Sequence, residues 1–218
     1  MRPHRFGLTL ISAVASLSVC LSAGSASALA PHGASPVAAE SPSAPPRTAP
    51  GARSLTVLTD LFAERLLVAD KVAAAKYGTT TPIDDPVREK AILDDVAARA
   101  VGLGLDPDAV TAVFRDQIEA NKLVQRGLYA RWDAHPEERP TERPDLVKEV
   151  RPVLDRITTQ LLSALQETAS LRAGASCGPR LRVAAVWSAV DHRLDRLHGQ
   201  GLVRALPSVC GPGPAARG

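Results

Sequence analysis

Two basic residues interrupt the apolar face of a strongly helical stretch that begins at Leu58. At 3.6 residues per turn, Arg65 and Lys76 fall on one stripe, in line with apolar residues such as Phe62 and Val72. The two cations are about three turns apart, or roughly 16 Å along the axis, so they could hold a small anion at two points. Long charged side chains are rarely enclosed without a partner of opposite charge. The alternative is that both side chains reach past the stripe into water, as most such residues do.

A second polar stripe follows further along the chain. Three amides, Gln117, Asn121 and Gln125, share one helical face. Phe114 and Leu128 lie on the same face, so amides stand where Leu or Ile would be expected. A buried amide without a hydrogen-bond partner costs about 1 to 3 kcal/mol, so these groups could form an amide network or lie on a wetter face. Beside a stripe that carries Arg and Lys, they fit a pocket for a polar, anionic ligand better.

Other classes of chemistry have no support in the sequence. No GxGxxG, Walker-type or GxSxG motif is present, and the histidines lack the spacing of metal ligands, so we predict no metal and no cofactor. Once Arg2 and Arg5 are set aside with the N-terminal segment, 24 basic residues stand against 23 acidic ones. A chain so nearly neutral gives no electrostatic argument for nucleic acid as a partner. Taken singly, Arg88, Glu89 and Arg151 are expected to be exposed charges.

Helices are expected to position these residues, because the sequence contains no strand alternation and no hairpin signal. Aromatic residues make up only 3% of the chain while Leu, Val and Ala are plentiful, which favours a helical core. We predict an all-α fold, a single bundle of about six helices whose boundaries are set by Asp-Pro pairs, Gly and Pro. The expected helices are 54–77, a second from Asp84 or Asp85 to about 102, 106–132, a fourth that begins near Val150 after a polar connector over 133–144, 180–198, and a short piece over 202–206.

The N-terminal residues 1–30 have the pattern of a secretory signal peptide. A basic start and an apolar run lead to small residues, with cleavage expected after Ala28 or Ala30. A retained membrane anchor is the alternative, but the apolar run is short and contains several serines, so we expect no stable anchor. Lipidation of Cys20 is a further, minor option. The pattern therefore predicts an exported protein, secreted or periplasmic.

Three segments are expected after the signal peptide. Residues 31–52 are rich in Pro, Ala and Ser and predict a disordered leader, the helical domain spans 53–210, and 211–218 form a disordered tail. Two cysteines remain in the exported chain, Cys177 and Cys210. An even count in an exported chain predicts a disulfide between them, with two free buried thiols as the alternative.

Four features together resemble the exported class of all-helical chorismate mutases. They are the segments AERLLVADKVAAAK, PIDDPVRE and DQIEANKLVQ, and the pair Cys177 and Cys210. The resemblance covers about 54–210 and depends on the ordered spacing of several polar groups. It implies the intramolecular [3,3] rearrangement of chorismate to prephenate, which needs no nucleophile, metal or cofactor. The family also allows a homodimer.

The resemblance implies a role for each site residue. Arg65 and Arg151 resemble the two arginines that clamp the substrate carboxylates, the second supplied by the same chain rather than across a dimer. Lys76 and Gln125 resemble the residues that donate to the breaking ether oxygen from opposite sides. The remaining site residues are Arg88, a site arginine, Glu89, which accepts from the ring hydroxyl in some members, and Asn121, a small polar residue near a carboxylate.

One position departs from the family pattern. Some exported members have a glutamine one turn beyond the matched Arg88, where this chain has Ile92, so Glu89 would take the hydroxyl contact alone. The alternative function is a non-catalytic exported helical domain that binds a partner or a small anionic metabolite. Such a domain would be expected to have lost a donor to the ether oxygen, but Lys76 and Gln125 are both present.

Overall fold

The computed structural model describes residues 50–211, with side chains from Leu55 onward, and this part of the chain is helical without strands. The all-α prediction is confirmed for these residues, with seven α-helices where about six were expected. They are α1 (Pro50–Lys76), α2 (Pro86–Gly102), α3 (Pro107–Ala134), α4 (Arg151–Glu167), α5 (Ala169–Arg172), α6 (Cys177–Asp191) and α7 (Arg196–Arg204). A 3-10 turn, η1 (Pro136–Glu138), and a π-helical turn, η2 (Leu146–Val150), lie between α3 and α4.

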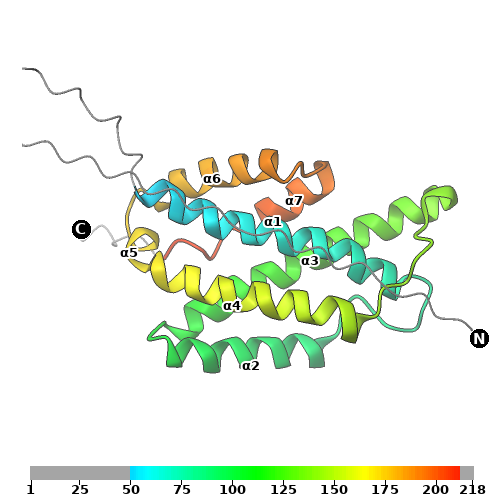
Figure 1. Ribbon diagram of the computed structural model, residues 1–218, viewed down its shortest axis with the longest axis horizontal. Coiled ribbons are helices and arrows are strands. Elements are labelled where there is room, and N and C mark those ends of the chain that lie inside the picture. The colour runs from blue at the N-terminus through cyan, green and yellow to red at the C-terminus, as the bar shows by residue number, and fades with distance from the viewer. Residues whose placement is uncertain (1–49, 212–218) are drawn as a thin grey trace, which may run out of the picture. The chain divides into compact units, whose positions relative to one another are not determined.

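The central helix is α1. It packs against α3, α4, α6 and α7, while α2 packs on α3 and α4 (Figure 1). Leu58, Phe62 and Leu66 of α1 are at most 1% exposed, so this helix contributes large side chains to the core. A substitution such as Phe62→Ala would cost about 3 to 5 kcal/mol of stability.

Asp-Pro pairs start two of the helices, as predicted. The side chain of Asp85 accepts a hydrogen bond from the Arg88 amide at 2.9 Å, and Asp106 caps α3 in a similar way. Each carboxylate satisfies an N–H that has no partner inside its helix, and the following proline has no N–H to satisfy. In contrast, α1 begins at Pro50, so the expected start at Ser54 is wrong by one helical turn.

The expected helix over 180–198 is wrong, because the chain turns between α6 and α7. Arg193 takes a left-handed conformation, with φ of 51°, just after α6. Asp195 then caps α7 by accepting from the His198 amide at 2.8 Å. The expected short piece over 202–206 is largely the end of α7. This turn lets α7 fold back and pack against α1 and α3.

The start of the fourth helix was expected near Val150, and α4 begins at the next residue, Arg151. The turn η2 leads into it, and Asp145 caps this turn by accepting from the amides of Val147 and Lys148 at 2.8 and 3.0 Å. This entry buries Val150 and leaves Arg151 exposed.

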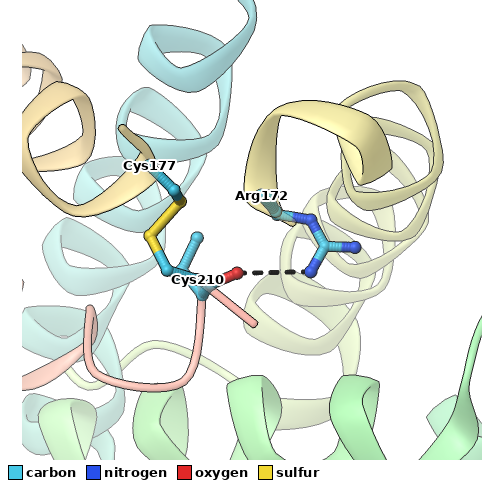
Figure 2. The surroundings of a disulfide bond; sticks show 4 residues. Arg172, Cys177 and Cys210 are labelled. Carbon is cyan, nitrogen blue, oxygen red and sulfur yellow. Dashed lines mark hydrogen bonds between the residues drawn. A yellow bond between two sulfur atoms is a disulfide. The ribbon is translucent and has the colours of Figure 1, made fainter. Parts of the chain in front are cut away.

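A disulfide joins the start of α6 to the C-terminal segment. Cys177 and Cys210 form the predicted bond, with their Cα atoms 5.8 Å apart. Arg172 donates to the Val209 carbonyl at 3.3 Å (Figure 2). Its own carbonyl accepts from the Gly211 amide at 3.1 Å. The C-terminal segment is therefore held by a covalent bond and by hydrogen bonds to Arg172.

Several predictions concern residues outside the described range. The signal peptide over 1–30, Cys20 and most of the leader over 31–52 fall there, as do residues 212–218 of the tail. None of the helices in the described range combines the length and the apolar character that crossing a membrane requires.

Candidate active site

A cavity of about 180 Å³ lies where α1, α2, α3 and the start of α4 meet. Its walls hold apolar side chains, among them Val72, Ile92 and Leu154, together with many polar ones. All seven residues predicted to form a substrate site lie in this lining: Arg65, Lys76, Arg88, Glu89, Asn121, Gln125 and Arg151. The packing of four helices therefore brings together residues that are distant in the sequence, such as Arg65 and Arg151, which are 86 positions apart.

Arg65 is a buried cation without a matching anion. It is 5% exposed, donates to the Thr158 hydroxyl at 3.4 Å and lies 5.9 Å from the centre of the Phe114 ring. Its Nε is buried without a hydrogen-bond partner, and it forms no salt bridge with a described carboxylate. Burial lowers the pKa of Arg65 to about 10, while the charge of Asp155 acts in the opposite direction. Arg65 therefore stays charged at neutral pH.

Lys76, the last residue of α1, brings a second cation to the cavity. Its ammonium donates to the Pro82 carbonyl at 2.8 Å, which leaves other N–H donors for a ligand. Burial lowers the pKa of this lysine, and the charges of Asp85, Glu89 and Asp84 oppose the shift. No described carboxylate forms a salt bridge with it, so its charge is also unmatched by direct contact.

Asn121 and Gln125 form a hydrogen-bonded pair on α3. The Asn121 amide donates to the Arg65 carbonyl at 3.3 Å and accepts from the Gln125 nitrogen at 2.7 Å. The first bond requires the Asn121 nitrogen to face α1, which turns its oxygen toward Gln125 and fixes the direction of the Gln125 amide. Gln125 is 3% exposed, and its nitrogen carries a second N–H. One donor of a buried amide is thus available to a ligand.

Gln117 shares the α3 stripe but does not line the cavity, so its assignment to a ligand pocket is wrong. It donates to the Ala205 carbonyl at 3.2 Å, at the end of α7. The stripe therefore has two parts. Gln117 links α3 to α7 by a hydrogen bond, as the amide-network alternative predicts, whereas Asn121 and Gln125 line the cavity.

Arg88 and Arg151 line the cavity from α2 and α4, and both are exposed, as expected for each taken singly. Within the described part of the chain, neither guanidinium has a hydrogen bond or a salt bridge. With Arg65 and Lys76 they make four cations that lack a contacting anion. A cavity of this kind is complementary to a small ligand with more than one negative charge.

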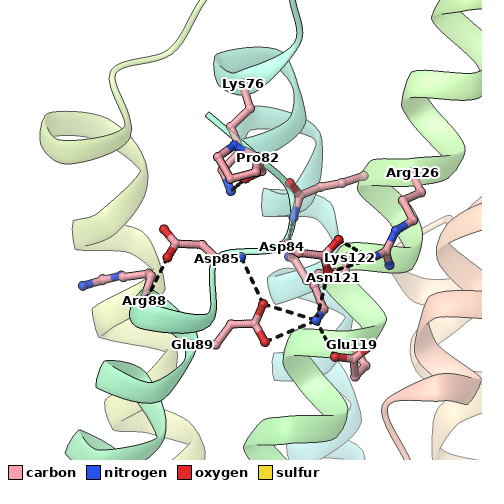
Figure 3. Close-up of polar contacts among 11 residues, drawn as sticks. Lys76, Pro82, Asp84, Asp85, Arg88, Glu89, Glu119, Asn121, Lys122 and Arg126 are labelled. Atoms are coloured by element: carbon pink, nitrogen blue, oxygen red, sulfur yellow. Dashed lines mark hydrogen bonds and ion pairs between the residues drawn. The ribbon is translucent and has the colours of Figure 1, made fainter. Parts of the chain in front are cut away.

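Glu89 contacts a residue that the sequence analysis did not single out. Lys122, on α3, is 8% exposed, and its ammonium lies 3.2 Å from each oxygen of the Glu89 carboxylate. Glu119 and Asp84 also contact the ammonium, at 2.5 and 3.3 Å (Figure 3). The i, i+3 spacing of Glu119 and Lys122 is a visible signal, but such pairs are usually solvated. The contact with Glu89 depends on how α2 packs on α3, which no local pattern reports.

One group of described residues could approach a metal ion. It consists of His135, Glu137 and Glu138 around η1, all of them exposed, and Glu138 is already paired with Arg131. These residues are not part of the cavity lining.

Similarity to known proteins connects this cavity with a family. Residues 56–126 match the family described as chorismate mutase type II, a range that covers most of α1, all of α2 and most of α3. Over 168 residues the chain is 35% identical to the secreted chorismate mutase of Mycobacterium tuberculosis, which covers 77% of this chain and 84% of that protein. The chain belongs to the chorismate mutase family. The resemblance stated from the sequence is thereby confirmed.

Further chorismate mutases extend the likeness. The secreted chorismate mutase of Mycolicibacterium smegmatis is 32% identical over 166 residues, which are 76% of this chain and 91% of that protein. The crystal structure of the chorismate mutase from Burkholderia phymatum matches with a TM-score of 0.71 and 33% identity, over 74% of this chain and 99% of that one. The structure from Burkholderia thailandensis matches with a TM-score of 0.68 and 39% identity, over 72% and 99%. The helical bundle is therefore that of the chorismate mutase family.

Proposed function

We propose that this chain converts chorismate to prephenate in the cavity between α1, α2, α3 and α4. The observation that carries the proposal is Arg65, a buried cation without an anion, in a cavity with three further unpaired cations. Chorismate has two carboxylates, so it would supply the missing negative charges. Membership of the family supports this choice of substrate.

The cations would first hold the substrate in its reactive shape. The reaction is an intramolecular [3,3] shift, in which a carbon–oxygen bond breaks as a carbon–carbon bond forms, so restraint to the compact conformer accelerates it. Arg65 and Arg151 would each hold one carboxylate, because the planar guanidinium can bind a carboxylate through two hydrogen bonds. Arg88 would add positive charge, and the remaining N–H of Asn121 would donate to a carboxylate.

Two donors would then stabilise the charge that grows on the ether oxygen. Lys76 has N–H groups beyond the one bound to Pro82, and the orientation of Gln125 leaves it one N–H. Both donors are in place before the reaction begins. Gln125 is 3% exposed, and electrostatic stabilisation by a buried donor is stronger than in water. We assign the ether oxygen to these two residues, and the ring hydroxyl to Glu89 because Ile92 offers no polar group.

Turnover of chorismate by a lysine variant tests the proposal. The chain is purified with its disulfide formed, and the loss of chorismate and appearance of prephenate are followed. We expect Lys76→Ala to lower kcat by about 10²- to 10³-fold or more, as the loss of one preorganised donor does. The matched control is Lys71→Ala, because Lys71 is an exposed lysine on the same helix and should leave turnover unchanged.

The alternative function predicts a different outcome in the same experiment. A non-catalytic domain would bind small dicarboxylates through Arg65 but would not consume chorismate. Absence of turnover by the folded, disulfide-bonded protein, with dicarboxylate binding retained, would overturn the catalytic proposal in favour of this one.

We also propose that the chain acts after export. The signal-peptide pattern over 1–30 and the Cys177–Cys210 disulfide support export, as does the name "secreted chorismate mutase" given to three relatives. Mass spectrometry of the exported protein should find an N-terminus that follows Ala28 or Ala30. A lipid-modified Cys20 as the first residue would replace this proposal with an anchored form.

A homodimer, which the family allows, would use the exposed side of α6. Val183, Val186, Trp187 and Val190 are 58 to 64% exposed and follow the i, i+3, i+4, i+7 spacing of one stripe. In an antiparallel pair of α6 helices, Arg180 at one end of the stripe would approach the partner's Asp191. Sedimentation should find a dimer that Trp187→Glu dissociates, whereas a monomeric wild-type chain would overturn the assignment.

A further inference from the structure

Lys122 is an unusual component of a cavity that already holds four unpaired cations. Its side chain is 10% exposed and lies in the cavity lining. Its ammonium contacts Glu89 through both carboxylate oxygens at 3.2 Å, Glu119 at 2.5 Å and Asp84 at 3.3 Å (Figure 3). Unlike the other cations of the cavity, it is therefore saturated by carboxylates of the protein and is not available to a substrate anion.

The environment keeps Lys122 charged. Burial disfavours the ammonium form, but the hydrogen bonds with Glu119, Glu89 and Asp84 together outweigh burial and raise the pKa of Lys122. Asp84 is in turn held by Arg126, whose guanidinium donates to both Asp84 oxygens at 2.7 Å. The cluster thus links α2 and α3 through ionised groups on one side of the cavity.

The hydrogen bonds of Glu89 leave it one free acceptor position. Its Oε1 accepts from the Asp85 amide at 3.3 Å and from Lys122, which uses both lone pairs of that oxygen. Its Oε2 accepts only from Lys122. An ionised carboxylate accepts hydrogen bonds and donates none, so the free position on Oε2 suits a hydroxyl and rejects a carbonyl or an ether.

We propose that Lys122 is the positioning residue that makes Glu89 selective for the ring hydroxyl of the substrate. Lys122 holds the Glu89 carboxylate at one orientation, with Oε2 as its open acceptor. This inference rests on the proposed function, because it names the substrate group that Glu89 accepts.

A double-mutant cycle separates this role from simple stabilisation. Wild-type, Lys122→Met, Glu89→Gln and the double variant are compared for kcat and KM with chorismate. We expect Lys122→Met to raise KM by about tenfold or more with a smaller change in kcat, since a hydrogen bond to a charged group is lost on binding. In the Glu89→Gln background the same substitution should change KM by less than about twofold, because its target carboxylate is gone.

Matched variants and a second ligand complete the test. Lys122→Arg keeps the charge and should retain most of the affinity, and Lys90→Met removes an exposed lysine paired with Asp94 and should leave KM unchanged. Binding of a chorismate analogue without the ring hydroxyl, measured by calorimetry, should be insensitive to Lys122→Met. If Lys122→Met does not fold, Lys122→Gln is used in its place.

Two results would overturn the proposal. One is a rise in KM on Lys122→Met that is just as large in the Glu89→Gln background as in wild-type. The other is a loss of affinity on Lys122→Met that is as large for the analogue without the hydroxyl as for chorismate. Failure of the proposed function is a distinct result, because the wild-type chain would then bind chorismate without turnover. The binding cycle can still be measured in that case.

Discussion

The orientation of one amide decides whether Gln125 can serve as a donor. Asn121 sets this orientation, because it is itself fixed by the Arg65 carbonyl. We expect Asn121→Ala to lower kcat by about five- to tenfold, the effect of one neutral hydrogen bond of about 1 kcal/mol. The comparison is with Gln117→Ala, which removes another buried amide of α3 and should lower the melting temperature without changing kcat. Equal kcat values for the two variants would contradict the orienting role of Asn121.

The pH dependence of the rate follows from the chemical type of the two ether-oxygen donors. An amide donates at any pH, so kcat/KM should be nearly flat from about pH 5 to about pH 8. Lys76 donates as a cation only below its pKa, which burial lowers from 10.5, so the rate should fall on the alkaline side at a lower pH than for an exposed lysine.

The pH-rate profile of Gln125→Glu provides the comparison. A carboxylic acid must be protonated to donate, so the rate of this variant should decrease as the pH rises from about 5 to about 8. A steep change of the wild-type rate over that range, with the fold intact, would contradict the assignment of Gln125.

At the residue scale, sequence reasoning succeeded where helix periodicity and the family resemblance apply. The spacing of Arg65 and Lys76 along one helix predicts that both face the same side, and both line the cavity. It missed Lys122, because two of the carboxylates that contact this lysine, those of Glu89 and Asp84, lie outside its own helix. Gln117 and Gln125 look equivalent in the sequence, and only the position of α7 separates their environments.

His198 is the clearest link between elements, since it joins α7 to α1. Its ring nitrogens contact Asp70 of α1 at 2.9 Å and Asp195 at 2.7 Å, with its side chain 6% exposed. The hydrogen bond to Asp70 raises the pKa of His198 to about 8 despite burial, with help from Asp195. The folded-state pKa lies above 6.5, so this stabilisation is fully present below pH 6.5 and is lost as the pH rises through about 8.

Urea unfolding at two pH values tests this link. The carboxylates of Asp70 and Asp195 are about half exposed, which screens the interaction and limits its contribution to about 1 kcal/mol. We expect wild-type to exceed Asp70→Asn in unfolding free energy by about that amount at pH 6 and by clearly less at pH 9. A difference that is the same at both pH values would mean that His198 does not contribute as a cation.

Element boundaries could be predicted where Pro, Gly and Asp mark them. The starts of α2 and α3 follow from Asp-Pro pairs, because proline is compatible with the first turn and aspartate caps it. The turn between α6 and α7 carries neither proline nor glycine over 192–195. Arg193 adopts the left-handed conformation there, at a cost that the packing of α7 against α1 and α3 offsets. Such a break is set by tertiary contacts and has no strong local signal.

At the scale of the whole described domain, the cavity and the covalent bond belong to different parts. Residues of α1, α2, α3, η2 and α4, with the loop after α1, line the cavity, whereas the disulfide joins α6 to the segment after α7. The end of α7 and the segment after it contact α3 at Asp116, which does not line the cavity. Arg204 and the Ser208 amide both donate to this carboxylate. The disulfide should therefore act on stability more than on catalysis.

Replacement of both cysteines tests this separation. Cys177 and Cys210 are 33 residues apart, and a loop of this length is expected to lower the entropy of the unfolded chain enough to stabilise the fold by about 3 to 4 kcal/mol. The Cys177→Ala/Cys210→Ala variant should lose about that much unfolding free energy. At a temperature where circular dichroism finds the variant folded, its kcat should stay within about twofold of wild-type, because no cavity residue lies in the closed loop. A large fall in kcat in the folded variant would mean that strain or motion in the α6–α7 region reaches the cavity through α1, which packs against both α4 and α6.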